Sequence, residues 1–284
     1  YLLSDSVKTG AQQALMAPEV LEGYRAAEAS AVQVPFVVIA LAFLALAGVI
    51  AMVTLPRILE GNAGGGDTKS VLSDRRLLAG AAGIFVYVGA EVALGSYMVN
   101  YGLHLGVQEM IDSTPILHKM ASLAASIKGQ AVGGMDPKAQ LGVLLTFYWG
   151  GAMIGRFIGA ALMQRIRPGI LLSVFAVIAA FLVVTSMMAS GLTALLALLA
   201  VGLFNSIMFP TIFTLGIENL GDSKPQGSGV LCTAIVGGAF IPPAFGALVD
   251  VSGFSLALVL PVLCYFYIAG FGYVFGSKGS RMAA

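Results

Sequence analysis

Long apolar runs alternate with short clusters of charged residues along most of the chain. Because an α-helix needs about 20 mostly apolar residues to cross about 30 Å of hydrocarbon, each run of that length predicts a membrane-spanning helix. The charge-free stretch 168–217 is too long for one helix, and Ser190-Gly191 divides it into two. The pattern therefore predicts an all-α integral membrane protein with seven spans, at residues 34–56, 77–100, 140–163, 169–189, 193–216, 227–249 and 255–275.

The amino-acid composition supports a membrane protein. Charged residues make up 10% of the chain and apolar residues 58%, whereas about 25% of the residues in a soluble domain are charged. A soluble globular fold is therefore excluded, because the chain has too few polar side chains to cover its surface. The net charge of +1 gives no overall field for binding nucleic acid. Cys232 and Cys264 lie in apolar runs, which predicts packing residues rather than disulfide partners.

The distribution of lysine and arginine predicts the orientation in the membrane. Short loops on one side of the predicted spans carry most of the basic residues, which places that side in the cytoplasm. Because the number of spans is odd, the chain is expected to begin outside the cytoplasm and to end inside it. Outside the spans, segments 12–31 and 116–131 could form amphipathic surface helices, and the glycine-rich stretch 61–74 is expected to be a flexible linker.

Three side chains are predicted to share one level near the middle of the membrane. At a rise of about 1.5 Å per residue, Glu91 and Trp149 lie about 14 Å, and Asn205 about 18 Å, below the outer ends of their helices. An ionisable side chain at such a depth is costly unless it is paired, hydrated or protonated, and it usually has a function. We therefore predict that Glu91 faces a cavity, the alternative being a structural carboxyl group.

Arginine residues are expected nearer the cytoplasmic end. Arg156 is predicted about 24 Å down its helix, too far from Glu91 for a direct ion pair unless the helix tilts or water intervenes. Its side chain could reach the membrane interface or bind a helix end, which favours a structural or gating role over contact with a ligand.

Aromatic rings beside amide and carboxyl groups are the combination that sugar binding requires, because a sugar presents both apolar C–H faces and hydroxyl groups. The candidates for such a site are Tyr87, Glu91, Tyr97, Asn100, Tyr148, Trp149 and Asn205. The alternative is that the tyrosines anchor helices at the membrane interface. No enzyme motif occurs, and His104 and His118 lack the spacing of metal ligands, so neither an enzyme nor a metal site is expected.

Glycines and prolines predict two features of helix packing. Gly151, Gly155 and Gly159 recur at four-residue spacing, which places them on one helix face and lets a neighbouring helix approach closely. The pair Pro242-Pro243 removes two backbone donors, so the sixth span is expected to kink or break there.

Several segments resemble one family of transporters. Residues 87–101 (YVGAEVALGSYMVNY) are similar to the seventh span of the fucose permease and glucose/galactose transporter group of the major facilitator superfamily. Residues 148–159 (YWGGAMIGRFIG) resemble its eighth span, and 204–216 (FNSIMFPTIFTLG) and 227–232 (GSGVLC) its tenth and eleventh. Residues 24–30 (YRAAEAS) are similar to the loop before its sixth span. The matching segments occur in the order of that family.

The resemblance implies twelve spans in two six-helix bundles, of which this chain holds the sixth span and the carboxy-terminal bundle. The chain, which begins with Tyr1, is thus expected to be partial and to lack the first five spans. The acidic residues thought to carry the proton in that family lie in the missing amino-terminal bundle, so no position here inherits their role. The resemblance divides the chain into an outer loop (1–33), the last helix of the amino-terminal bundle (34–56), a cytoplasmic linker (57–76), the carboxy-terminal bundle (77–276) and a cytoplasmic tail (277–284).

The function implied by the resemblance is secondary transport of a monosaccharide such as fucose, glucose or galactose. The expected setting is the lipid of the cytoplasmic (inner) membrane, where a proton gradient drives alternating access without a cofactor. Sodium coupling and a non-transporting membrane scaffold are the alternatives. Arg156, Arg165 and Arg167 fall where the superfamily repeats a basic gate motif, which makes them candidates for gating.

Overall fold

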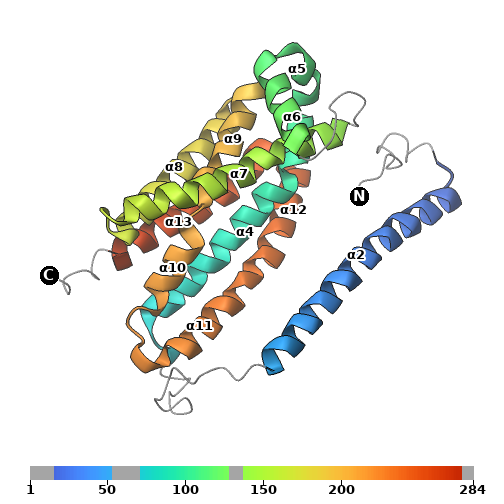
Figure 1. Cartoon of the computed structure of the whole chain (residues 1–284). Coiled ribbons are helices and arrows are strands. Elements are labelled where there is room, and N and C mark those ends of the chain that lie inside the picture. Colours follow the sequence, from blue (N-terminus) through green and yellow to red (C-terminus); the bar gives the residue numbers. More distant parts are fainter. Residues whose placement is uncertain (1–15, 53–70, 128–136, 277–284) are drawn as a thin grey trace. The chain divides into compact units, whose positions relative to one another are not determined.

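The computed structural model describes residues 16–52, 71–127 and 137–276. Within these ranges, every regular element is a helix. The chain divides into two compact units, Tyr1–Ala63 and Gly64–Ala284. The first unit contains α2 (Pro18–Met52), and the second contains α4 to α13 (Figure 1).

The first unit is built on one helix of 35 residues. Its stretch Phe36–Ile50 is an apolar helix shorter than the candidate spans of the second unit. The surface helix expected at 12–31 and the span expected at 34–56 are therefore parts of one helix. Pro35 lies inside α2 close to this junction, and the helix continues through it although proline has no N–H to donate. Residues 12–15 and 53–56 lie outside the described residues.

Six segments in the described part of the second unit are long and apolar enough to cross a membrane. They differ from the predicted spans by a few residues at most ends, because caps and turns rather than hydropathy fix the end of a helix. Six candidate spans and the shorter apolar helix of α2 in the described residues agree with the all-α membrane protein that the sequence predicts. The segments are α4 (Arg75–His104), α7 (Pro137–Met163), α8 (Pro168–Met188), α9 (Gly191–Asn205) with α10 (Met208–Ile217), α11 (Lys224–Thr233) with η2 (Ala234–Val236) and α12 (Gly237–Ala257), and α13 (Val259–Gly276).

Two shorter helices, α5 (Val107–Ser113) and α6 (Pro115–Ile127), follow α4. Gly106, with φ of 65°, makes the left-handed turn into α5 that residues with a side chain rarely adopt. The surface helix predicted at 116–131 corresponds to α6 as far as Ile127, and the remainder lies outside the described residues. Because Ala124 and Ala125 pack with Val143 and Phe147 of α7, α6 rests on the bundle.

Two spans are interrupted close to prolines, and α12 has a further non-helical residue at Gly253, with φ of 79°. Pro210 has no N–H to offer the carbonyl of Ser206, and the helix stops after Asn205 and restarts at Met208. Of the predicted kink or break at Pro242-Pro243, the break is wrong, because α12 continues through both residues, and the 3₁₀ turn η2 precedes it. A proline ring presses on the carbonyl four residues earlier, so the strain falls near Gly238, beside η2.

Close contacts between glycines and neighbouring helices hold α7 against α9. A Cβ on Gly155 would lie 2.1 Å from the carbonyl oxygen of Leu203, and one on Gly159 would lie 2.2 Å from the Ile207 side chain. A Cβ on Gly202 of α9 would in turn lie 2.2 Å from the carbonyl oxygen of Tyr148. The packing role predicted for the glycine stripe of α7 is confirmed.

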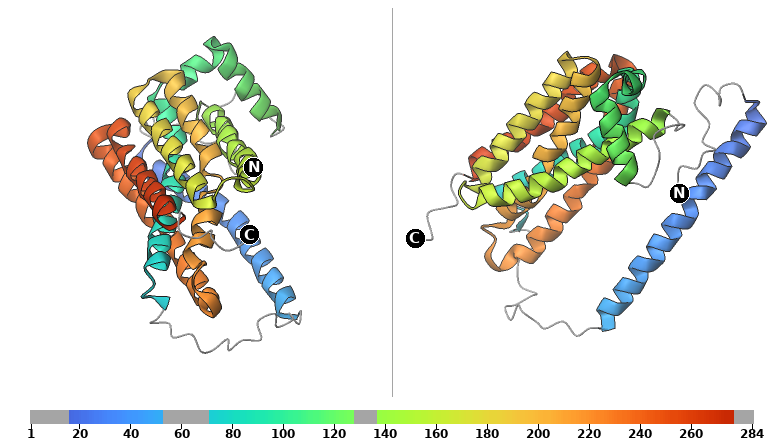
Figure 2. Two further views of the ribbon diagram at one scale, coloured as in Figure 1. Left: turned by 90° about the vertical axis from the view of Figure 1, so that its left-hand side faces the viewer. Right: turned by 45° about the horizontal axis from the view of Figure 1, so that its top comes forward.

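The helix α4 lies between α10 and α12 in the bundle (Figures 1 and 2). Asp74 starts α4 by accepting a hydrogen bond of 2.8 Å from the N–H of Leu77. The next residue but one, Arg76, is buried, forms an ion pair with Glu218 at the end of α10, and donates to the carbonyl oxygen of Phe275 at 3.0 Å. One end of the bundle is thus tied across three helices.

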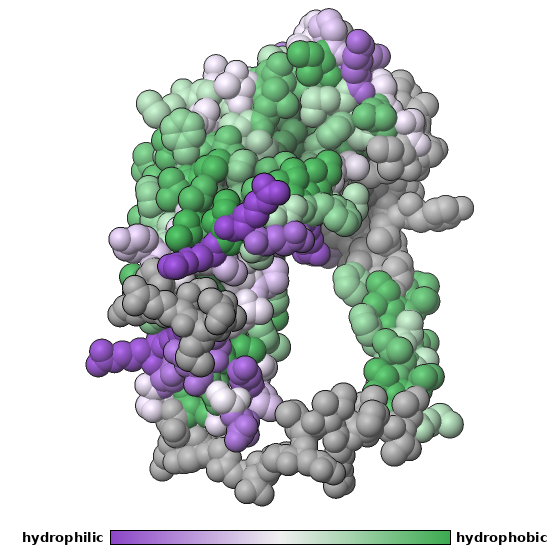
Figure 3. Space-filling model, turned by 60° about the vertical axis from the view of Figure 1, so that its left-hand side comes forward, coloured by the Kyte–Doolittle hydropathy of each residue, from purple (hydrophilic) through white to green (hydrophobic). Residues whose placement is uncertain are grey.

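The surface agrees with a membrane location. In Figure 3 the upper part of the face in view is mostly hydrophobic, and hydrophilic side chains gather in groups across its centre, below it and at the top. Large apolar side chains on α7 and α8 are exposed, among them Phe157 and Phe181. Exposed groups of this kind are stable in contact with lipid or with another helix.

Candidate functional site

A network of polar side chains lies inside the bundle, at a level where its helices are otherwise apolar. The hydroxyl of Tyr87 on α4 lies 2.8 Å from Oε1 of Glu91, one turn further along the same helix. The same hydroxyl lies 3.1 Å from the main-chain carbonyl oxygen of Asn205, the last residue of α9. The interruption between α9 and α10 therefore places a backbone acceptor beside the carboxyl group.

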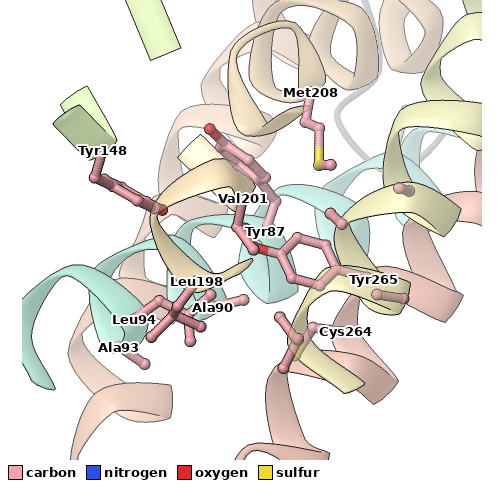
Figure 4. Packing of buried hydrophobic residues seen from close by; sticks show 14 of the residues in the cluster. Tyr87, Ala90, Ala93, Leu94, Tyr148, Leu198, Val201, Met208, Cys264 and Tyr265 are labelled. Atoms are coloured by element: carbon pink, nitrogen blue, oxygen red, sulfur yellow. The ribbon is translucent and has the colours of Figure 1, made fainter. Parts of the chain in front are cut away.

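The Asn205 side chain extends the network to two more helices. Its Nδ2 donates to the hydroxyl of Tyr148 on α7 at 2.8 Å, and both residues are fully buried. The hydroxyl of Tyr265 on α13 faces the same amide. Neither that hydroxyl nor Oδ1 of Asn205 has a partner of normal hydrogen-bond geometry. In Figure 4, Tyr148 and Tyr265 point their hydroxyl groups toward one another.

Trp149 connects this network to the surface. Its ring meets that of Tyr148 edge-on, with centroids 5.2 Å apart, and the side chain is 51% exposed. The ring also lies beside Gly95, one turn beyond the partly exposed Glu91 on α4. An open hollow of about 560 Å³ adjoins it, lined by Gly142, Leu145, Thr146, Trp149, Gly150 and Met153. The exposed indole thus lies about one helical turn along α4 from Glu91.

Two other candidates lie apart from the network. Tyr97 packs its ring edge-on against Phe245 at 5.1 Å, and its hydroxyl lies against Gly246 of α12. Asn100 is exposed, nine residues beyond Glu91, which is about 13.5 Å along the helix. The structure therefore brings Glu91, Tyr148, Trp149 and Asn205 together, but not Tyr97 or Asn100.

The three arginines proposed for gating lie in two different parts of the structure. Arg156 is an exposed residue of α7, seven residues beyond Trp149 or about 10 Å along the helix. Its charge acts on Glu91, yet among the described residues no ion pair joins them. Arg165 and Arg167 are exposed in the turn between α7 and α8, where Arg167 precedes the first residue of α8.

Tyr265 is not among the site residues that the sequence predicts. It lies in an apolar run of α13 without a charged neighbour, and the polar groups that it faces come from α7 and α9. The only signal was a tyrosine far from either end of a predicted span, a position where a hydroxyl group needs a partner.

Comparison with known proteins supplies relatives for this arrangement, although no family model matches the chain. The glucose/galactose transporter of Brucella abortus is 42% identical over 254 residues, or 89% of this chain and 55% of that protein. The putative glucose/galactose transporter of Helicobacter pylori is 38% identical, over 86% and 54%. The L-fucose-proton symporter of Escherichia coli is 30% identical, over 88% and 53%. The chain spans about half the length of the curated relatives it matches.

Solved structures agree with these relatives. The Escherichia coli fucose:proton symporter FucP matches with a TM-score of 0.64 at 28% identity, over 94% of this chain and 60% of that one. FucP in the outward conformation, a major facilitator superfamily transporter, matches with a TM-score of 0.62. The chain belongs to the major facilitator superfamily. Its resemblance to the fucose and glucose/galactose transporter group is confirmed, and these relatives are named as transporters rather than enzymes.

Proposed function

We propose that the chain supplies one helical bundle of a secondary transporter that imports a monosaccharide, such as fucose, glucose or galactose, together with protons. The names of the Brucella, Helicobacter and Escherichia relatives support a sugar substrate, and the name of the last supports a proton as the coupling ion. The activity belongs to the whole transporter, in which a second bundle completes the cavity. Lysine and arginine positions support an inner-membrane orientation with the carboxy-terminal end in the cytoplasm.

The observation that carries this proposal is the exposed indole of Trp149, about one helical turn along α4 from Glu91. The C–H face of a sugar ring stacks on the indole, and the Glu91 carboxyl bonds a sugar hydroxyl. Tyr148 and Asn205 lie behind the indole of Trp149 and hold it in place. Tyr97 and Asn100 lie further toward the carboxy-terminal end of α4, so they contact the sugar only if it enters from that end of the helix.

Transport follows from movement of the two bundles around this level of the membrane, as in other transporters with a midplane site. Each bundle moves largely as a rigid body, so the sugar is exposed first to one side and then to the other. Arg156, Arg165 and Arg167 act as gating residues at the end predicted to be cytoplasmic.

Uptake of labelled fucose, glucose and galactose by vesicles containing the whole transporter tests the proposal. We expect accumulation of one of these sugars when a pH gradient is imposed and none with a sodium gradient alone. In Trp149→Ala, KM should rise about tenfold, equivalent to about 1.4 kcal/mol of binding. Phe157→Ala is the matched control, because Phe157 is an exposed aromatic residue on the same helix, two turns away.

Three results would contradict the proposal. Sodium-driven uptake would mean that sodium rather than the proton is the coupling ion. Absence of uptake of any sugar would favour a membrane scaffold. An unchanged KM in Trp149→Ala would remove the indole from the substrate path.

A further inference from the structure

The hydroxyl of Tyr87 faces two acceptors but has one hydrogen to give. It lies 2.8 Å from Oε1 of Glu91 and 3.1 Å from the carbonyl oxygen of Asn205. A tyrosine hydroxyl donates one hydrogen bond and can also accept. The acceptor that receives the hydrogen is therefore decided by the state of the carboxyl group.

An ionised Glu91 can only accept, and a charged acceptor makes the stronger bond, so Tyr87 donates to it. A protonated Glu91 carries its own O–H and can donate to the oxygen of Tyr87. The Tyr87 hydrogen is then free to bond the carbonyl oxygen of Asn205. The two states differ by one proton on Glu91, and Tyr87 keeps its hydrogen in both.

The second acceptor belongs to an interrupted helix. Asn205 is the last residue of α9, and the last carbonyl groups of a helix lack partners within it. Pro210 removes a further donor at this junction. The Tyr87 hydroxyl therefore supplies or withholds a hydrogen bond at the point where α9 and α10 are joined only by Ser206 and Ile207.

We propose that Glu91, Tyr87 and the Asn205 carbonyl form a proton-binding site of this bundle, in which protonation of Glu91 transfers the Tyr87 hydrogen bond to the α9–α10 junction. Proton binding forms one O–H bond on the carboxylate, and proton release breaks it. The site rests on the proposed function only in that its proton is the one coupled to sugar movement.

The other groups that act on this site come from two neighbouring helices. The titratable or charged groups that interact with Glu91 are Tyr87 on α4, Tyr148 and Arg156 on α7, and Tyr265 on α13. The helices α9 and α10 contain no Asp, Glu, Lys, Arg or His. On α12, Asp250 lies beyond Gly246, which packs on Tyr97, so it is more than a turn past Glu91.

Infrared difference spectroscopy between acidic and alkaline pH tests the site without requiring transport. The purified protein is isotope-labelled at the main-chain carbonyl of asparagine. We expect a protonated-carboxyl band that is absent in Glu91→Gln, and an asparagine carbonyl band that changes with it. In Tyr87→Phe the carboxyl band should remain and the asparagine band should vanish from the difference spectrum. Tyr101→Phe is the matched control, because Tyr101 is a buried tyrosine of the same helix that bonds Ser186 instead.

Transport by Glu91→Gln provides a second measurement. The Gln amide donates to Tyr87 as a protonated carboxyl does, but it cannot release a proton. We expect pH-driven accumulation to fall about tenfold or more, within the usual range of coupling between two sites, and to fall further than sugar exchange does. Absence of any Glu91 carboxyl band, or an asparagine band unchanged in Tyr87→Phe, would overturn the proposed site. Normal infrared bands without sugar uptake would support the site and contradict only the proposed function.

Discussion

Several buried polar side chains in this bundle bond to helices other than their own. The Tyr101 hydroxyl lies 2.8 Å from the carbonyl oxygen of Ser186 on α8, and Ser186 Oγ lies 2.8 Å from the carbonyl oxygen of Ala194 on α9. Asn205 and Tyr148 join α9 to α7 in the same way. Because hydrocarbon supplies no competing hydrogen bonds, these pairs both satisfy the polar groups and fix the register of neighbouring helices.

The Asn205–Tyr148 bond gives the first prediction. Tyr148→Phe should lower the free energy of unfolding by roughly 1 kcal/mol, because it leaves Nδ2 of Asn205 without a partner. Thermal unfolding of the purified protein in detergent measures this. Tyr267→Phe is the control, since the Tyr267 hydroxyl bonds the carbonyl oxygen of Ala79 near the surface. Equal stability of the two variants would mean that the buried bond contributes nothing.

The sequence identified Glu91 because a charge inside an apolar run is visible without a structure. It also predicted how deep Trp149 and Asn205 lie in the membrane, because the rise per residue of a helix gives the depth of each position. It could not identify the partner of Glu91 among several tyrosines, because that choice depends on how neighbouring helices are rotated. For the same reason Tyr97 was grouped with the site, whereas its ring packs against Phe245.

Helices in this bundle approach one another closely at glycines, which have no side chain. A Cβ on Gly169 of α8 would lie 2.2 Å from the Cα of Gly276 on α13, as close as the contacts that Gly155 makes with α9. In membranes, small residues permit this approach, and the gain in van der Waals contact replaces the hydrophobic effect.

Gly155→Ala tests the α7–α9 contact. The added Cβ would lie 2.1 Å from the Leu203 carbonyl oxygen and 2.6 Å from Ser206 Oγ, so α7 must shift. We expect a loss of about 1–3 kcal/mol in the free energy of unfolding, the usual cost of overpacking. Gly150→Ala on the same helix is the matched control, because no atom lies within 4 Å of its Cβ position. A similar unfolding temperature for both variants would contradict the close contact.

The sequence predicted the existence of the helices better than their interruptions. Span length follows from the number of apolar residues, which is local information. The position of a break depends on where strain can be released. Pro242-Pro243 lie inside α12, and the helix changes to the 3₁₀ turn η2 ahead of them. The interruption at Ser206 and Ile207 lies within one apolar run, and only Pro210 indicated it.

In the second unit, the polar contacts that join helices and the exposed charged side chain of α7 lie at different positions. Arg76, Glu218 and the Phe275 carbonyl tie together α4, α10 and α13, so these helices are expected to move as one body. Arg156 is exposed on α7 instead. It follows Gly155, which contacts Ser206 at the α9–α10 junction. A charge in this position is suited to contacts that change between conformations.

Arg156→Ala in the whole transporter should therefore slow the interconversion of outward and inward states more than it weakens sugar binding. The physical reason is distance, because Arg156 lies about 10 Å along α7 from the indole of Trp149. We expect sugar exchange across vesicle membranes to slow about tenfold, with a dissociation constant within about twofold of the parent value by calorimetry, a difference under about 0.5 kcal/mol. Arg156→Lys keeps the charge and should exchange sugar faster than the Ala variant. A large loss of equilibrium binding with a normal exchange rate would instead assign Arg156 to the sugar site.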